Sequence, residues 1–187
     1  IGCNEYRGAG KGVEMQSADV IRKQLYKLYY WHTEVRIADL GNVKTGATWA
    51  DSIAALKTVC KELIGAGKKV IIIGGSHDNT LAQYNACADR KQIIEAVVVD
   101  ALIDLKQDTP FRCENFLHEM LLNEPNYIQH YNHIAFQSYF VHPYLLETID
   151  KLRFDCFRLG KVKEHIEEME PVVRSSHLFS LDINALA

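Results

Sequence analysis

Short apolar runs alternate with stretches of helical periodicity along the whole chain. The runs at 70–73 and 96–99 are continuous and apolar, which is typical of parallel strands covered on both faces. Apolar positions three and four residues apart predict helices at 17–30, at about 48–65 and at 79–88. Further strands are expected at 1–3, 35–40, 133–136, 154–159 and 178–183. This alternation predicts an α/β fold in three layers, a mostly parallel sheet with helices on both faces.

The composition fits a single domain that spans residues 1–187. Hydrophobic residues make up 48% of the chain, which is enough for a substantial buried core. We find no internal repeat, low-complexity tract or linker. The chain opens without a methionine and stops just after a strand-like run, so we expect a fragment or a record of ordered residues only.

Charge, apolar run length and cysteine spacing indicate which classes of partner and which cellular compartment to expect. The net charge of −3 provides no basic field for phosphate backbones, so nucleic acid is not an expected partner. The apolar runs are far shorter than the roughly 20 residues of a membrane helix, and no signal peptide is visible. Five cysteines without a C-x-x-C pair fit free thiols in a reducing compartment. We expect a soluble protein of the cytoplasm.

Three apolar strands run directly into polar residues that can bind metals. Their sequences are VIIIGGSHD, AVVVDALID and LFSLDIN, and the polar residues are His77, Asp78, Asp100, Asp104, Asp182 and Asn184. Parallel strands bring such ends to one edge of the sheet, where ligands collect. Alone, each cluster has a structural explanation: a satisfied histidine, aspartates that cap helices, or an anion-binding GGS loop. Together they favour Mn²⁺ or Zn²⁺, because carboxylates need a cation to lie close together.

The same three segments resemble the motifs of the ureohydrolase superfamily, which comprises arginase, agmatinase and formiminoglutamase. The family patterns G-G-D-H, D-A-H-x-D and S-x-D-x-D-x-x-D-P correspond in order and spacing to G-G-S-H at 74–77, D-A-L-I-D at 100–104 and S-L-D-I-N-A-L-A at 180–187. The Gly-rich loop and the segment A-D-V-I-R-K at 18–23 also resemble the family's first loop and helix. The resemblance covers nearly the whole chain and implies an arginase-like domain that lacks the family's C-terminal third.

The resemblance implies a manganese centre in which only one of two family positions is retained. One ion's four protein ligands are matched by His77, Asp100, Asp104 and Asp182. The second ion's exclusive ligands, a histidine and an aspartate in the family, are Leu102 and Asn184 here. Leucine cannot ligate a metal, and a neutral amide is a poorer partner than carboxylate for a second cation. We therefore predict a one-metal site.

The implied reaction is hydrolysis of a C–N bond in a linear amidine or guanidine, a small-molecule substrate. In the family, hydroxide bridging two ions about 3.5–4 Å apart attacks the substrate carbon. With one ion the water should be less acidic and the rate lower. Ser76 and Ala187 stand where the family has acidic residues. The Ser76 hydroxyl or the Asp78 carboxylate could support His77.

A family histidine that relays protons is matched approximately by His118. A structural alternative is an amphipathic helix built on Phe116, Leu117, Met120 and Leu121, with His118 in solvent. The formiminoglutamase-like branch is the nearest, because T-P-F-R at 109–112 could offer Arg112 to a substrate carboxylate. The resemblance also implies a homo-oligomer.

Two other interpretations stay open. One is a catalytically silent relative that keeps the fold and a metal for binding, regulation or assembly. The other is a nucleotide-binding α/β module in which G-G-S at 74–76 cradles phosphate, although the glycine spacing of known phosphate loops is absent. The charged run at 161–170 is interpreted as one solvated amphipathic helix. The remaining histidines are interpreted as surface or packing residues: His32, His130, His133, His142, His165 and His177.

Overall fold

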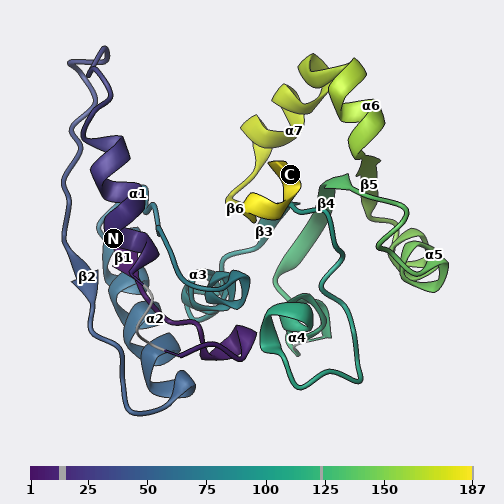
Figure 1. Ribbon diagram of the computed structural model, residues 1–187, viewed down its shortest axis with the longest axis horizontal. Helices are drawn as coiled ribbons and strands as arrows, with labels where there is room; N and C mark the ends of the chain where they lie inside the picture. The colour runs from purple at the N-terminus through teal and green to yellow at the C-terminus, as the bar shows by residue number, and fades with distance from the viewer. Residues whose placement is uncertain (13–15, 123, 187) are drawn as a thin grey trace. The chain divides into compact units, whose positions relative to one another are not determined.

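A computed structural model describes residues 1–12, 16–122 and 124–186 of the chain. Position 187, where the family motif has an acidic residue, lies outside the described residues. The chain divides into two compact units, Ile1–Ala86 and Cys87–Ala187 (Figure 1). All five cysteines are free thiols, as predicted.

The first unit joins a small parallel sheet to three helices. Its elements are β1 (Gly2–Cys3), α1 (Ser17–Leu25), β2 (Asn42–Val43), α2 (Trp49–Gly65), the 3-10 helix η2 (His77–Asn79) and α3 (Thr80–Ala88), with a further short 3-10 helix η1 at Arg7–Ala9. Strand β1 pairs with β2 in parallel and forms an isolated parallel bridge from Gly2 to Ile73. The buried core consists of Cys3, Ile53, Leu56, Cys60, Ala82 and Ala86.

The start of α2 follows from its capping residues. The Thr48 side chain accepts a hydrogen bond from the Asp51 N–H at 3.2 Å, and the Asp51 carboxylate accepts one from the Thr48 N–H at 2.8 Å. This reciprocal capping box satisfies two backbone donors that the first turn would otherwise leave unpaired. The predicted helix is therefore confirmed, and its residues Ile53, Leu56 and Cys60 are buried.

Two strand predictions for the first unit are wrong in detail. Residues 35–40 form no strand, and the observed strand is Asn42–Val43. The side chain of Ile37 in this segment is 77% exposed. The apolar pattern there does not correspond to a buried face. In the run 70–73 only Ile73 forms a bridge, through hydrogen bonds of 2.9 Å with Ile1 and Cys3, and Ile71 is 72% exposed. This run is therefore not a strand covered on both faces.

The first long helix also ends earlier than its periodicity predicts. Helix α1 stops at Leu25, whereas the expected helix reached residue 30. Tyr26 follows the helix directly, and the aromatic run Tyr29, Tyr30 and Trp31 comes three residues later; all four side chains are exposed. Aromatic residues lose rotamer freedom against the preceding helical turn, and without burial nothing offsets this loss.

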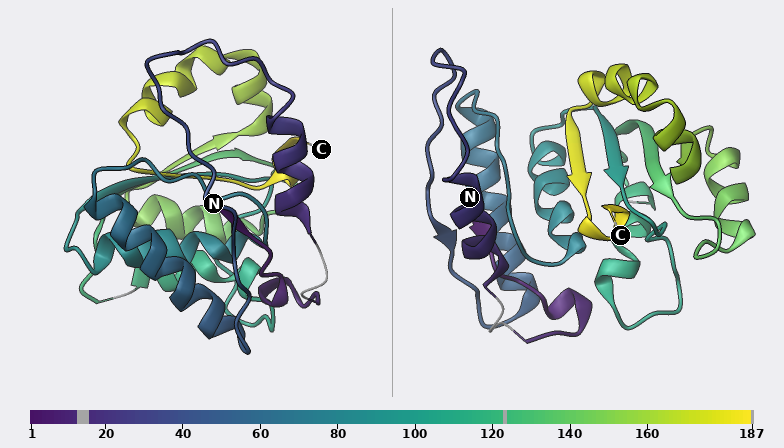
Figure 2. Two further views of the ribbon diagram at one scale, coloured as in Figure 1. Left: turned by 90° about the vertical axis from the view of Figure 1, so that its left-hand side faces the viewer. Right: turned by 45° about the horizontal axis from the view of Figure 1, so that its top comes forward.

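The second unit is built on a four-stranded parallel sheet in the order β5-β4-β3-β6. The strands are β3 (Ile94–Val99), β4 (Ile128–Phe136), β5 (Asp155–Arg158) and β6 (Leu178–Leu181). Helices α6 (Leu159–Glu164) and α7 (Met169–Ser175) lie on one face, and α4 (Phe116–Leu122) and α5 (Pro143–Lys151) lie on the other (Figure 2). The predicted parallel sheet with helices on both faces is confirmed.

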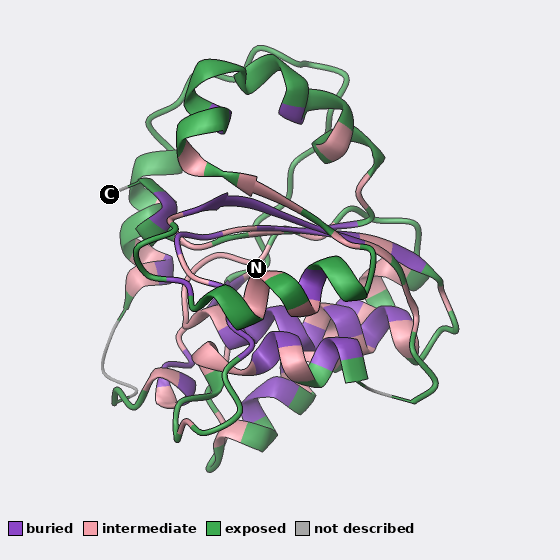
Figure 3. Cartoon of the chain, turned by 90° about the vertical axis from the view of Figure 1, so that its right-hand side faces the viewer, coloured by how far each residue is buried: buried purple, intermediate pink, exposed green. Residues whose placement is uncertain are grey.

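Burial is concentrated in the middle of this sheet. Along β3, residues Ala96, Val97 and Val98 are at most 1% exposed, whereas the helices keep their outer faces in solvent (Figure 3). One core cluster joins β3 and β4 to α6 and α7 through Val97, Ile134, Ala135, Val162 and Met169. The charged run 161–170 is not one helix, because α6 ends before His165 and a 3-10 turn at Ile166–Glu168 precedes α7.

Candidate metal centre

Two aspartates lie side by side where β3 and β6 end. In the parallel register Val99 pairs with Leu181, so Asp100 and Asp182 follow at the same level of the sheet. The Asp182 N–H donates to the Val99 carbonyl at 2.9 Å. Carboxylate oxygens of the two aspartates lie within 4.8 Å of one another. Asp100 is buried (2% exposed) and Asp182 is half-buried.

The same local turn aims both carboxylates. Oδ1 of Asp100 accepts a hydrogen bond from the Leu102 N–H at 3.1 Å, and Oδ1 of Asp182 accepts one from the Asn184 N–H at 2.8 Å. Aspartate readily forms this contact with the backbone two residues on, because its side chain is short. Each carboxylate is thereby fixed by the residue at which this chain departs from the ureohydrolase motif.

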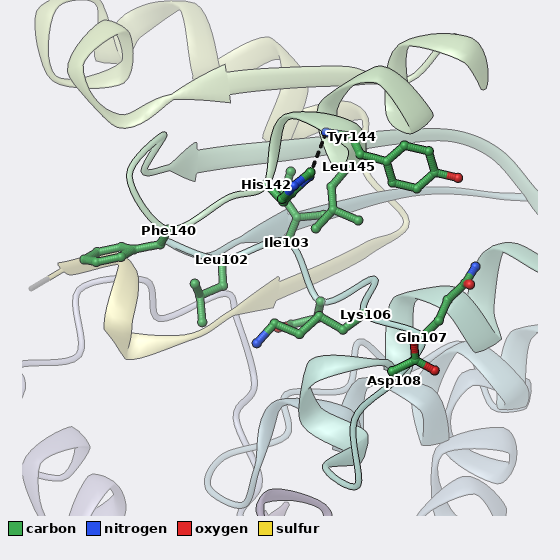
Figure 4. Close-up of a pocket in the computed structure, with 10 residues that line it drawn as sticks. Leu102, Ile103, Lys106, Gln107, Asp108, Phe140, His142, Tyr144 and Leu145 are labelled. Carbon is green, nitrogen blue, oxygen red and sulfur yellow. Dashed lines mark hydrogen bonds between the residues drawn. The ribbon is translucent and has the colours of Figure 1, made fainter.

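The third aspartate of the predicted ligand set lies in the loop after β3. Asp104 is 6% exposed, and its carbonyl accepts a hydrogen bond from the Leu117 N–H at the start of α4. Asp104 also lines a pocket of about 300 Å³. Figure 4 shows Leu102 and Phe140 on one side of this pocket and Gln107 and Asp108 on the other.

An ion pair holds the loop that carries one wall of this pocket. Lys106 Nζ lies 3.0 Å from Glu114 Oε2, and the Thr109 hydroxyl donates to the same oxygen at 2.9 Å. These two donors keep the pKa of the Glu114 carboxyl below its usual value. The loop from 106 to 114 is therefore closed on itself beside Asp104.

The predicted histidine ligand, His77, belongs to the first unit and begins the 3-10 helix η2. Gly74 and Gly75 precede it with φ angles of +85° and +79°. A Cβ on Gly74 would lie 2.7 Å from the Ala18 nitrogen, so only glycine fits this approach. Close packing and the left-handed backbone therefore account for both glycines.

Neighbouring residues anchor the His77 loop to the rest of the first unit. The Ser76 hydroxyl donates to the Glu5 carbonyl at 3.2 Å. Asp78 is fully buried, and its carboxylate accepts a hydrogen bond from the Trp49 indole N–H. The bonds made by Ser76 and Asp78 fix the loop on which His77 lies, and direct support of His77 by either side chain stays a prediction.

Helix α4 carries the proposed proton relay, His118. Phe116, Leu117, Met120 and Leu121 are buried, so the amphipathic helix expected as the structural alternative is present. His118 itself is half-buried, and its role in catalysis stays a prediction. Arg112, offered as a contact for a substrate carboxylate, lies 3.9 Å from Glu119 and is exposed.

One pair of residues near the site was missed by sequence reasoning. His133 and Tyr131 are fully buried on β4, and their side chains are joined by a 2.7 Å hydrogen bond. His133 Nε2 lies 3.1 Å from the backbone carbonyl oxygen of Asp100. Their spacing of two residues on a strand places both on one face. That spacing was the available signal, but the contact with Asp100 depends on the pairing of β3 with β4.

Comparisons with known proteins agree with this parallel α/β architecture. The class defined is the ureohydrolase superfamily. The chain matches the model of the Arginase family over residues 5–187, and it belongs to that family. No curated protein was found to match the sequence. Among the described helices, none has the length and apolar character needed to cross a membrane.

Solved structures share the fold at low sequence identity. A variant of Trypanosoma cruzi formiminoglutamase, solved with Mn²⁺, aligns with a TM-score of 0.84 and 15% identity, covering 100% of this chain and 69% of that one. Bacillus subtilis formimidoylglutamase gives 0.76 and 18%, covering 98% and 64%. Agmatine ureohydrolase of Thermoplasma volcanium gives 0.70 and 20%, covering 96% and 64%. These likenesses establish the arginase fold, and this chain spans about two thirds of the relatives' length.

Proposed function

We propose that this protein binds one divalent cation, Mn²⁺ as the first candidate, at the carboxyl ends of β3 and β6. The observation that supports this most strongly is the approach of the Asp100 and Asp182 carboxylates to within 4.8 Å. Two like charges at that distance repel by about 3 kcal/mol at an effective dielectric constant near 20. A cation between them would convert this repulsion into attraction. The oxygen donors suit a hard metal ion such as Mn²⁺.

The ligands proposed for the ion are Asp100, Asp182 and Asp104, and the family motif adds His77 as the fourth ligand. Backbone N–H groups hold one oxygen of each strand-end carboxylate, so those two ligands need little reordering when a cation binds. We propose that the second ion of the ureohydrolases is absent. Leu102 offers no donor atom, and the neutral amide of Asn184 replaces a carboxylate.

The activity proposed is hydrolysis of the C–N bond of a linear amidine or guanidine. A divalent ion, when bound, would acidify water and polarise the substrate. The pocket beside Asp104, with a volume of about 300 Å³, is the proposed place for the substrate's chain. His118 is the proposed proton relay. The neighbours named formiminoglutamase and agmatine ureohydrolase support this substrate class.

A second candidate is a catalytically silent protein that keeps the metal site. Both positions that would hold a second ion are altered, because the Leu102 side chain has no donor atom and the Asn184 amide is neutral. A chain with one ion should generate less hydroxide at neutral pH than one with two. Binding or regulation would then replace turnover.

Metal stoichiometry tests the proposal. We expect one Mn²⁺ per chain after loading and desalting, and none in the Asp100→Ala, Asp182→Ala double variant. Asp150→Ala, which changes an exposed aspartate on α5, is the matched control and should keep the ion. An ion-free parent chain would overturn the metal proposal.

Substrate incubation then separates the two candidates. The metal-loaded protein is incubated with arginine, agmatine or formiminoglutamate, and urea, ammonia or formamide is measured. Product formation that disappears in the double variant would establish the hydrolase. A loaded protein that forms none of these products would favour the silent relative.

A further inference from the structure

A buried chain of hydrogen bonds runs from β4 to the end of β3. The Tyr131 hydroxyl lies 2.7 Å from His133 Nδ1, and His133 Nε2 lies 3.1 Å from the Asp100 carbonyl oxygen. Tyr131 and His133 are 0% exposed, and Asp100 is 2% exposed. Water therefore does not compete for these hydrogen bonds.

The direction of each hydrogen bond follows from the chemistry of its ends. A carbonyl oxygen can only accept, so His133 carries its proton on Nε2 and donates to Asp100. Nδ1 of the neutral ring must then accept, and the Tyr131 hydroxyl donates to it. Burial raises the pKa of Tyr131 well above its ordinary value, so the phenol keeps its proton. Tyr131 thereby selects the tautomer that His133 needs.

The bond to Asp100 meets a requirement created by the end of the strand. The Asp100 N–H still donates to the Ile134 carbonyl at 3.1 Å, but the chain bends at Ala101 and Leu102. A buried carbonyl that leaves a sheet needs another donor, and His133 provides it. The Leu102 N–H also donates to Oδ1 of Asp100. Hydrogen bonds therefore fix the amide, the carbonyl and the carboxylate of Asp100.

We propose that His133, oriented by Tyr131, is a positioning residue for the metal centre: its bond to the Asp100 carbonyl fixes the direction from which the Asp100 carboxylate meets the cation. This inference rests on the proposed function, because it takes Asp100 as a metal ligand. The strand end at Asp182 uses a different arrangement, in which its carbonyl accepts from the Ala185 N–H at 3.1 Å within the same turn.

Stability alone gives little reason for two buried polar side chains at this place. A buried hydrogen-bonded pair replaced by apolar groups of the same shape is often nearly neutral for folding. The pair does provide direction, because a histidine held at both nitrogens cannot rotate. Partners that support metal ligands in this way typically change metal affinity about 10- to 100-fold when removed.

Two substitutions of His133 separate positioning from packing. In His133→Asn the amide oxygen occupies the place of Nδ1 and can still accept from Tyr131, but the donor to Asp100 is lost. In His133→Gln the amide nitrogen reaches the place of Nε2 and can still donate to Asp100. Tyr131→Phe removes only the hydroxyl that selects the tautomer. This variant tests the positioning role if either His133 variant fails to fold.

The test measures the Mn²⁺ dissociation constant of the full chain by electron paramagnetic resonance of free Mn²⁺, with urea unfolding of the metal-free protein alongside. We expect His133→Asn to weaken binding about 10- to 100-fold, His133→Gln to stay within about threefold of the parent, and Tyr131→Phe to fall between them. The spectrum of bound Mn²⁺ should broaden in His133→Asn and not in His133→Gln.

The outcomes distinguish this inference from the proposed function. If the parent binds Mn²⁺ and His133→Asn binds equally well, or both His133 variants weaken binding equally, the positioning role is wrong. If only Tyr131→Phe folds and it binds like the parent, the role is also wrong. A parent that binds no Mn²⁺ would overturn the proposed function, and this inference with it.

Discussion

The ends of β3 and β6 place the same residue in two different settings. Each strand is followed by an aspartate whose carboxylate accepts from the N–H two residues on. Strand β3 has hydrogen-bonded neighbours on both sides, whereas β6 pairs with β3 alone among the strands assigned in the second unit. Asp100 is correspondingly buried, and Asp182 is half-buried. The local sequence sets the turn, and the number of neighbouring strands determines how deeply its aspartate is buried.

This difference predicts unequal contributions to metal binding. Two charges interact more strongly where water is excluded, and the buried Asp100 has the extra support of His133. We expect the affinity for an ion at this edge of the sheet to depend more on the Asp100 carboxylate than on the Asp182 carboxylate.

Single substitutions of the two aspartates give the largest expected effect. Asp100→Ala should weaken Mn²⁺ binding by more than about 100-fold, and Asp182→Ala by about 10-fold, because the more buried charge is less screened. Isothermal titration calorimetry measures both constants, with Asp150→Ala as the control. Equal losses, or a larger loss for Asp182→Ala, would contradict the comparison.

A second prediction restores donor atoms at both strand ends together. The double variant Leu102→His, Asn184→Asp adds an imidazole after β3 and a carboxylate after β6, which are the ligand types of Mn²⁺ sites. We expect the number of bound Mn²⁺ ions to rise from one to two per chain, with the added ion bound less tightly. Elemental analysis counts the ions.

The single variants Leu102→His and Asn184→Asp are the controls for this gain. Each provides one exclusive ligand only, so each should stay at one ion per chain. A double variant that also binds one ion would mean that substitutions at 102 and 184 do not explain the loss of the second position.

The positions of the strand-end aspartates could be predicted from the sequence, because their signal is local. A polar residue directly after a continuous apolar run, as in Val99 followed by Asp100, marks the end of a buried parallel strand. The helix expected from about residue 48 is an equally local feature, and the structure shows that reciprocal hydrogen bonds between Thr48 and Asp51 fix its start. Such features need no knowledge of which strands are neighbours.

The parts that were missed depend on pairing between distant segments. The role of His133 arises only because β4 lies beside β3 and places its ring against the Asp100 carbonyl. The predicted strand at 35–40 failed for the same reason in reverse: its apolar residues have no buried face to cover. Apolar spacing indicates what could be buried, and the tertiary fold decides what is.

The smallest expected effect concerns the backbone of β4 beside Asp100. Ala135 has a φ of +72°, and the register between β4 and β5 shifts between Ile134 and Phe136. A left-handed residue other than glycine costs about 1–2 kcal/mol, and a β-branched side chain fits this region worst. Such bulges are frequent beside active sites, because they redirect the chain. The end of β6 carries no positive φ among the described residues.

We therefore expect Ala135→Val to lower the free energy of unfolding by about 2 kcal/mol more than Ala96→Val. Both alanines are buried in the same sheet, so overpacking is expected in both variants, and the positive φ angle is particular to Ala135. Ala135→Gly should change the free energy by less than about 0.5 kcal/mol, because relief of the left-handed conformation offsets the greater entropy of the unfolded chain. Urea unfolding of the metal-free protein measures all three, and equal losses for the two valine variants would show that the bulge stores no strain.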